Sequence, residues 1–258
     1  MRIGLVLSGG GARGVSHLGV IKALQEANVE FDAISGSSAG AIVGAFIAAG
    51  YTPEEVCKFI EQTSLFNTFR LSLNRRSILK IDKGAKELLK YFPADSFEDL
   101  KIPLYVTTTD IKKGKIKVYK KGQLIKPILA SSSIPVVFDP MKIGTRYLVD
   151  GGILDNFPIS PIRKEVDLIV GLHCNPIDPI STLPAWKSLL ERSMMMTMTQ
   201  LAHSKKKKCS VFLEPLGLSK YNVFSFNKVK EIFDFGYNYA KDEIDKGILD
   251  PLKYETAE

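Results

Sequence analysis

Cysteine is scarce in this sequence: Cys57, Cys174 and Cys209 are the only three in 258 residues. They lie too far apart for the usual spacing of metal ligands. Their scarcity argues against a disulfide framework and favours a reducing compartment. The sequence also lacks the EF-hand spacing of carboxylates, so calcium dependence is not expected. We therefore expect neither a metal nor a cofactor.

Long hydrophobic runs are missing as well. The longest apolar segment, AGAIVGAFIAAG at 39–50, is shorter than the ~20 residues that cross a bilayer. The N-terminal segment, MRIGLVLSGGGARG, has a brief apolar stretch that runs into glycines, which indicates a first strand rather than a secretory signal. The sequence therefore predicts a cytoplasmic location, with possible peripheral contact at the inner membrane surface.

The abundant feature is an alternation of predicted strands and helices. Hydrophobic residues make up 45% of the chain and charged residues 24%, which is typical of a globular protein. Strands are predicted at 2–8, 31–36, 102–110, 115–121, 146–152, 167–174 and 210–215. Helices are predicted at 14–28, 39–50, 52–63, 184–203 and 228–245, whereas 64–80 and 216–227 fit no element. We expect one three-layered α/β domain over 1–258, with a mostly parallel central sheet and helices on both faces.

The segment GSSAG at 36–40 spells G-x-S-x-G between a predicted strand and a predicted helix. Such a turn holds its central serine, Ser38, at the carboxyl edge of the sheet, while Gly36 and Gly40 allow close backbone packing. The start of the following helix also favours negative charge that develops there. Taken alone, the motif is better explained as a glycine-serine turn between tightly packed elements.

A second glycine-rich segment, GGGARG at 9–14, follows the first strand and opens the first helix. Such a loop can direct backbone N–H groups at a phosphate or an oxyanion. A dinucleotide site would need an acidic residue at the far end of the second strand, whereas Asp32 lies at its start. A P-loop would need lysine where Val15 stands. The predicted helix carries the chain ~20 Å away from this edge of the sheet, and the next strand carries it ~20 Å back. We therefore expect loop 9–14 to lie beside Ser38.

A serine nucleophile needs a proton acceptor, and the chain has three histidines. The order Ser38, Asp150 and then His173 or His203 would suit an α/β-hydrolase triad. One βα unit before the serine is too few for that fold, however, so the triad fits poorly. His17, one turn into the first helix, is expected to be a structural residue.

Asp150 is the stronger candidate for the base. It ends a predicted apolar strand, and the chain turns at once at Gly151 and Gly152. In isolation an ordinary Asp-Gly turn explains this pattern better. Beside a nucleophile and an oxyanion loop, Asp150 becomes the predicted general base of a Ser–Asp dyad.

Four segments, in this order, resemble the patatin-like phospholipases, a family of lipid acyl hydrolases with a Ser–Asp dyad. They are GGGARG at 9–14, GSSAG at 36–40, ASSSIP at 130–135 and DGGILDNFP at 150–158. All four lie within 1–175, the motif-bearing part of the domain, and residues 176–258 match less distinctly.

By this resemblance Ser38 is the nucleophile and Asp150 its proton acceptor. The oxyanion hole is assigned to the backbone of loop residues Gly10, Gly11, Ala12 and Arg13, with Arg13 also helping to hold the loop. The supporting motif positions are Gly9, Gly14, Gly36, Gly40, Gly151 and Gly152, and Asn156 and Pro158 also match the family's pattern.

The resemblance implies a serine acyl hydrolase that cleaves fatty-acyl esters of phospholipids or lysophospholipids through an acyl-enzyme, with no cofactor. A free carboxylate of pKa ~4 is a poor base for a hydroxyl, so burial should raise the pKa of Asp150. Two alternatives stay open: an esterase or thioesterase that acts on soluble acyl esters, and a non-catalytic lipid-binding regulatory module.

The net charge of +7 suggests an anionic partner. Residues 69–90 carry seven Lys or Arg and two acidic residues among apolar ones, which predicts possible contact with anionic membrane. A solvated surface with inward-facing leucines explains that segment slightly better. The lysines of 115–121 indicate an edge strand or hairpin, and those of 205–208 a solvated helix end. Neither segment carries a nucleic-acid motif, so no nucleic-acid binding is expected.

Overall fold

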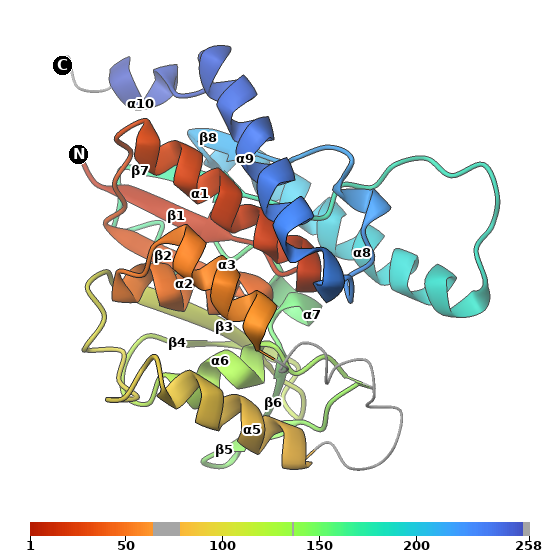
Figure 1. The fold of residues 1–258 in the computed structure, drawn as a ribbon. Coiled ribbons are helices and arrows are strands. Elements are labelled where there is room, and N and C mark those ends of the chain that lie inside the picture. The colour runs from red at the N-terminus through yellow and green to blue at the C-terminus, as the bar shows by residue number, and fades with distance from the viewer. Residues whose placement is uncertain (64–77, 136, 255–258) are drawn as a thin grey trace.

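The computed structural model describes residues 1–63, 78–135 and 137–254. An eight-stranded sheet forms the middle layer (Figure 1). Its strands are β1 (Ile3–Leu7), β2 (Ala33–Ser37), β3 (Leu104–Asp110), β4 (Lys115–Tyr119), β5 (Met141–Ile143), β6 (Arg146–Asp150), β7 (Leu168–Leu172) and β8 (Val211–Leu213). The strand order is β5-β6-β3-β2-β1-β7-β8, and β4 pairs with β3 off this path.

The sheet is mostly parallel, as the sequence predicted. β1, β2, β3, β7 and β8 form the parallel part. At the other end β4 and β6 pair antiparallel with β3, and β5 pairs antiparallel with β6. Among the described strands β4 pairs with β3 alone, so the lysine-rich segment is the predicted edge strand.

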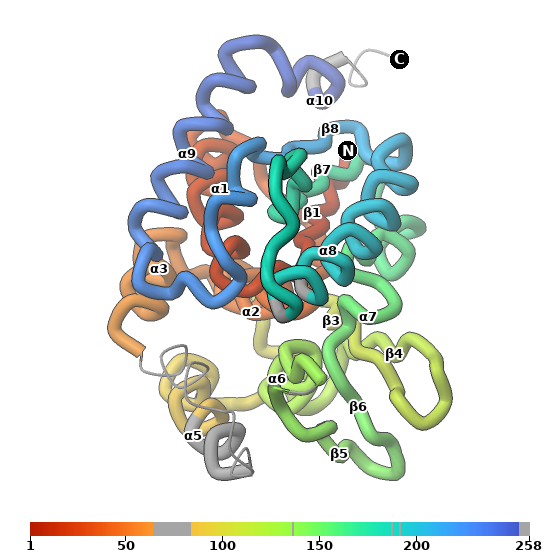
Figure 2. Tube along the Cα trace, turned by 90° about the vertical axis from the view of Figure 1, so that its right-hand side faces the viewer, coloured from red at the N-terminus to blue at the C-terminus, as the bar shows by residue number. Residues whose placement is uncertain are grey.

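Helices cover both faces of the sheet. The α-helices are α1 (Ser16–Glu26), α2 (Ala39–Ala49), α3 (Pro53–Gln62), α5 (Ile78–Leu89), α6 (Ile125–Ser131), α7 (Gly152–Asp155), α8 (Trp186–Lys205), α9 (Val229–Asp245) and α10 (Asp250–Tyr254). Short 3₁₀ helices are η1 (Gly11–Val15), η3 (Lys206–Lys208), η4 (Leu218–Lys220) and η5 (Phe226–Lys228). Figure 2 shows α1 and α9 on one side of the central strands and α8 on the other. None of the described helices is both long and apolar enough to span a bilayer.

Alternation along the central strands builds two cores. Successive side chains of a strand point to opposite faces of the sheet. Leu5 and Leu7 of β1 therefore join the larger core under α1, α2 and α9. Val6 points the other way and packs with Phe157 and Ala202 beneath α8. Burial on both faces explains why the parallel strands are continuous apolar runs.

Several elements differ from the sequence-based prediction, including the following three. α5 begins at Ile78, inside a range for which no element was expected. α6 includes Pro127, which is tolerated because it lies in the first turn of the helix. The first helix begins with the 3₁₀ turn η1, and α1 itself starts at Ser16. Of the predicted membrane segment 69–90, residues 69–77 lie outside the described residues.

Candidate active site

Ser38 lies at the turn between β2 and α2. Its backbone has φ 52° and ψ −124°, a conformation that costs a residue with a Cβ about 1–3 kcal/mol. The Ser38 N–H donates to Ser131 Oγ over 2.9 Å, and Ser131 Oγ donates to Thr107 O over 2.6 Å. A Cβ on Gly40 would lie 2.4 Å from Leu7 O, so the turn requires glycine there. These contacts hold the Ser38 side chain at the carboxyl edge of the sheet.

Asp150 is the last residue of β6, and its side chain is buried. Ser38 Oγ donates to Asp150 Oδ2 over 2.7 Å, and the Gly152 N–H donates to Oδ1 over 2.7 Å. Burial raises the pKa of Asp150 to about 6, although both hydrogen bonds oppose that shift. A carboxylate with this pKa is a better acceptor for a hydroxyl proton than an ordinary aspartate.

Strand β3 brings these two residues together. β2 pairs with the first half of β3 and ends with Ser37 opposite Thr107. β6 pairs with the second half and ends with Asp150 opposite Thr108. β4 occupies the other side of β3 along Val106–Asp110, so β2 and β6 share one side and meet end to end. Residues 112 positions apart in the sequence thereby become hydrogen-bond partners.

The carbonyl of Gly9 is fixed by two amide side chains behind loop 9–14. Asn175 Nδ2 donates to Gly9 O over 2.6 Å, and Asn156 Nδ2 donates to it over 3.2 Å. The C=O and N–H of a planar trans peptide point in opposite directions, so the Gly10 N–H faces away from both asparagines. Within the described residues the Gly10 and Gly11 N–H groups have no acceptor. Both amides are therefore available to a ligand.

Two of the four loop amides assigned to the oxyanion hole already have acceptors within the chain. The Ala12 N–H donates to Val223 O over 2.8 Å, and the Arg13 N–H donates to Gly10 O over 3.2 Å. Because these amides already bond to the chain, neither serves as a free donor. The Arg13 side chain holds the loop from outside, since its Nε donates to Tyr221 O over 2.7 Å.

An apolar pocket opens directly at the serine. Its lining consists of Gly11, Ser38, Ala39, Ile42, Ser132, Ile134, Val223, Phe224 and Phe226. Gly11 and Ser38 are thus exposed to the same space, and the remaining lining is mostly aliphatic and aromatic. A pocket with this lining suits an acyl chain whose carbonyl sits between the serine and the loop.

The histidines lie away from the Ser38–Asp150 pair. His17 is buried, and its Nε2 donates to Ser8 O over 2.9 Å. Burial lowers the pKa of His17 to about 4, so the ring is neutral at neutral pH. In the described structure none of the three histidines bonds to Ser38 or Asp150. The geometry therefore offers aspartate, and not histidine, as the acceptor.

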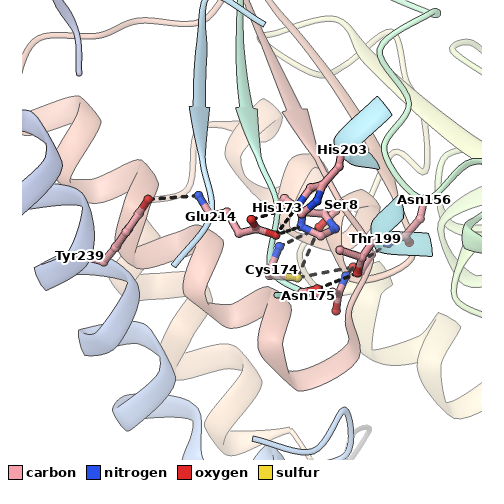
Figure 3. Close-up of polar contacts among 10 residues, drawn as sticks. Ser8, Asn156, His173, Cys174, Asn175, Thr199, His203, Glu214 and Tyr239 are labelled. Carbon is pink, nitrogen blue, oxygen red and sulfur yellow. Dashed lines mark hydrogen bonds and ion pairs between the residues drawn. The ribbon is translucent and has the colours of Figure 1, made fainter. Parts of the chain in front are cut away.

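One group of side chains has the composition of a metal site. The ligand atoms of His173, His203 and Glu214 lie within 4.8 Å of one another (Figure 3). Without a metal they already bond together: His173 Nδ1 to Glu214 over 2.7 Å, and His203 Nε2 to Glu214 over 3.0 Å. Burial alone would raise the pKa of Glu214, but the bonds to both histidines hold it below its usual range. The group ties α8 to the ends of β7 and β8.

Sequence reasoning gave no role to three residues that position the site. Ser131 lies in ASSSIP, but only its contact with the Ser38 N–H explains the motif. Asn156 was noted only as a match to the family pattern, because its contact partner, Gly9, lies 147 residues away in the sequence. Asn175 stands where the motif-bearing part ends, and no local signal marks it. Figure 3 shows Asn175 with Thr199, whose Oγ1 donates to Asn175 O over 2.7 Å.

Several known proteins resemble this chain in sequence or in fold. Residues 5–162 match the family model of patatin-like phospholipases. An uncharacterized NTE family protein of Mycobacterium tuberculosis is 36% identical over 177 residues, 67% of this chain and 49% of that protein. Lysophospholipase NTE1 of Coccidioides immitis is 28% identical over 296 aligned positions, 99% of this chain and 18% of that protein. The chain thus spans less than half the length of these curated relatives.

Among solved structures, VipD of Legionella pneumophila aligns with a TM-score of 0.53 and 17% identity, covering 90% of this chain and 67% of VipD. That identity shows a shared fold and nothing further. The family model, in contrast, covers more than half of the 258 residues. The chain therefore belongs to the patatin-like phospholipase family.

Proposed function

We propose that the chain hydrolyses fatty-acyl esters of phospholipids or lysophospholipids, with Ser38 as nucleophile and Asp150 as general base. The observation that carries this proposal is the 2.7 Å hydrogen bond from Ser38 Oγ to the buried Asp150 carboxylate. The name lysophospholipase, borne by a fungal relative, supports the same substrate class. Lipid would be met from the cytoplasmic side, at the inner membrane surface.

In the first half of the reaction, Asp150 takes the Ser38 proton as Oγ attacks the ester carbonyl. The carbonyl oxygen becomes an oxyanion and accepts hydrogen bonds from the Gly10 and Gly11 N–H groups. The C–O bond to the leaving alcohol then breaks, and Asp150 returns its proton to that oxygen. An acyl-serine remains, with its chain in the apolar pocket that Ile42, Phe224 and other residues line.

In the second half, water takes the place of the alcohol. Asp150 accepts a proton from water as its oxygen attacks the acyl carbonyl, and the same two amides stabilise the second oxyanion. Breaking the bond to Oγ releases the fatty acid, and the proton returns to Ser38. Burial suits Asp150 to this double role, because the raised pKa lets it both accept and return the proton near neutral pH.

The test compares wild-type protein with Ser38→Ala and Asp150→Asn. A fluorophosphonate probe should label wild-type protein at Ser38, and profiling of lipid products should show fatty acid release. Both variants should lose several orders of magnitude of activity, because members of one catalytic unit act together. Alanine at His17, His173 or His203 should leave substantial activity. A histidine variant as inactive as Asp150→Asn would overturn the assigned base.

Substrate comparison separates the two alternatives. An esterase or thioesterase would turn over a soluble short-chain ester well and phospholipid poorly. A lipid-binding module would show neither probe labelling nor turnover while still retaining lipid. The apolar lining beside Ser38 favours a fatty-acyl ester over a polar soluble ester, and turnover separates the enzyme from a lipid-binding module.

A further inference from the structure

Exposed apolar side chains are concentrated in one stretch of the chain. Of the fourteen large hydrophobic residues that are exposed in the described structure, eight lie between positions 180 and 201. They are Ile180, Leu183, Trp186, Leu189, Leu190, Met194, Met196 and Leu201, here called the apolar tip. Leu183 is 85% exposed and Trp186 is 71% exposed. Large contiguous apolar surface of this kind marks an interaction site.

The six tip residues on α8 share one half of the helix. At 3.6 residues per turn, positions 186, 189, 190, 194, 196 and 201 fall on one side. The opposite half attaches α8 to the protein. Thr199 and Ala202 are buried there, and Arg192 Nη2 donates to Asp178 O over 2.7 Å. The helix is therefore anchored by one half, and its other half presents the six tip residues to solvent together with the polar Ser193, Thr197 and Gln200.

The apolar tip lies at the edge of the sheet where the site opens. Figure 1 shows the N-terminal half of α8 and the preceding segment extending beyond the carboxyl ends of the parallel strands, and Figure 2 looks onto that edge. Residues 176–184 and α8 line a hollow together with 219–222. The next residues along the chain, Val223, Phe224 and Phe226, line the pocket at Ser38. Ile180 of the apolar tip lines this hollow as well. The tip and the Ser38 pocket therefore lie along the same edge of the sheet.

We propose that the apolar tip inserts into the surface of a lipid bilayer and brings the mouth of the Ser38 pocket to its substrate. The inference rests on the proposed lipid hydrolysis and adds the surface through which lipid is met. A second copy would offer the pocket no acyl ester, whereas a bilayer supplies what the pocket is proposed to hold. Tryptophan favours the membrane interface, and the exposed lysines Lys206, Lys207 and Lys208 follow α8 directly and can attract anionic headgroups.

Trp186 provides a direct measurement, because it is the only tryptophan in the sequence. Ser38→Ala protein, which should not consume lipid, is titrated with phosphatidylcholine vesicles. We expect the Trp186 emission to shift to the blue and to be quenched by phosphatidylcholine brominated on its acyl chains. Unchanged emission and no quenching at saturating lipid would overturn the proposal. Emission that instead shifts with protein concentration alone, together with a dimer in sedimentation, would assign the face to a second copy.

A matched pair of variants tests the apolar character of the surface. Leu189→Ser combined with Leu190→Ser removes two side chains of the tip. Ile111→Ser combined with Ile116→Ser removes two exposed side chains of similar size outside the tip, on β4 and the turn before it. The first pair should weaken vesicle binding on the order of 100-fold, because two leucine side chains are no longer available to enter the bilayer. The second pair should leave vesicle binding unchanged. Equal binding by both pairs would overturn the proposal.

Failure of this inference can be told from failure of the proposed function. Both double variants should hydrolyse a soluble short-chain ester at the wild-type rate, since neither touches the Ser38 pocket. Vesicle binding without release of fatty acid by wild-type protein would refute the function and leave the surface standing. If wild-type protein releases fatty acid but the Leu189/Leu190 variant binds vesicles normally, the proposed function stands and the proposed surface is refuted.

Discussion

Two residues of the site hold conformations or environments that are costly elsewhere in a protein. Ser38 has a positive φ without being glycine, and the turn is held by Ser131 and by close packing against Leu7. Asp150 is buried, and its carboxylate has Ser38 and the Gly152 amide as hydrogen-bond partners. Such features persist where the surrounding structure fixes them, and they are typical of reactive groups.

The pH dependence of the reaction should report Asp150. Below its pKa of about 6 the carboxyl is protonated and cannot accept the Ser38 proton. We therefore expect kcat/KM on a soluble ester to rise about tenfold per pH unit up to pH ~6 and then to level off. An inflection near pH 4 instead would mean that burial does not raise the pKa of the base. As a control, the His17→Ala variant should give the same pH profile as wild-type protein.

The backbone strain at Ser38 can be measured by comparing two inactive variants. Ser38→Ala and Ser38→Gly both remove the hydroxyl, but only glycine adopts φ 52° and ψ −124° without strain. Relief of strain exceeds the extra entropy of glycine in the unfolded chain, so Ser38→Gly should be more stable by about 1 kcal/mol. Urea denaturation provides the comparison. A more stable alanine variant would show that the turn is relaxed.

Asn175 should act as a positioning residue through Gly9. It donates the 2.6 Å hydrogen bond that fixes the Gly9 carbonyl and hence the direction of the Gly10 N–H. We expect Asn175→Asp, which keeps the shape and loses the donor, to lower kcat on the order of 100-fold, the scale of one lost oxyanion donor. KM for a soluble ester should change little. A change in KM alone would indicate a role in binding.

At the scale of elements, loop 9–14 is fixed by parts of the chain that are distant in sequence. Val223 accepts the Ala12 N–H, Tyr221 accepts from the Arg13 side chain, and Asn156 and Asn175 hold Gly9. The segment 216–227, for which no regular element was predicted, thus supports the loop from one side. A loop held this firmly presents its free amides without reorganisation during the reaction.

A pair of glycine variants tests that rigidity. Gly11 has φ +57°, and a Cβ there would lie 2.3 Å from Val223 O, whereas Gly114 has φ +59° with nothing within 4 Å. Alanine at either site costs about 1 kcal/mol of backbone strain. Only Gly11→Ala should also lose activity, on the order of 100-fold, because it displaces an oxyanion donor. Equal kcat for the two folded variants would remove loop 9–14 from the mechanism.

Most of the parallel sheet could be predicted because its strands are short, mostly apolar runs. β1, β2 and β7 lie within a few residues of their predicted bounds. The three-residue β5 carries too little pattern to be found, and α6 was hidden by Pro127. α5 was missed altogether, since Ile78–Leu89 begins within a segment that mixes basic and apolar residues without a clear cap.

The site was predictable wherever its residues sit in local motifs. Ser38, Asp150 and the glycines of loop 9–14 follow strand ends, where α/β sites gather. That the Ala12 amide is not free could not be predicted, because its acceptor is Val223 O, more than 200 residues away. Asn175 escaped notice for the same reason: its partner is Gly9, and the contact is created only by the pairing of β1 with β7.

At the scale of the whole molecule, two different forces could bring the protein to lipid. The apolar tip acts through hydrophobic contact, which salt does not screen. The basic segment 69–90, partly outside the described residues, would act through charge, which salt does screen. The two surfaces can therefore be separated by ionic strength.

The basic segment gives its own prediction. Reversal of Arg70, Arg75 and Arg76 to glutamate should weaken binding to anionic vesicles, because each basic residue contributes ~1 kcal/mol near anionic lipid. The loss should be larger at low salt than at high salt, and cleavage of a soluble short-chain ester should not change. Vesicle sedimentation at two salt concentrations measures the effect. Equal binding of wild-type and variant protein at low salt would end the hypothesis.

The end-to-end meeting of β2 and β6 on β3 also governs when reactivity can arise during synthesis. Asp150 is translated 112 residues after Ser38. Asn175, which fixes the Gly9 carbonyl, is made later still. A nascent chain therefore carries the serine without its proposed proton acceptor until β6 has been translated. The proposed Ser38–Asp150 dyad can assemble only after that point.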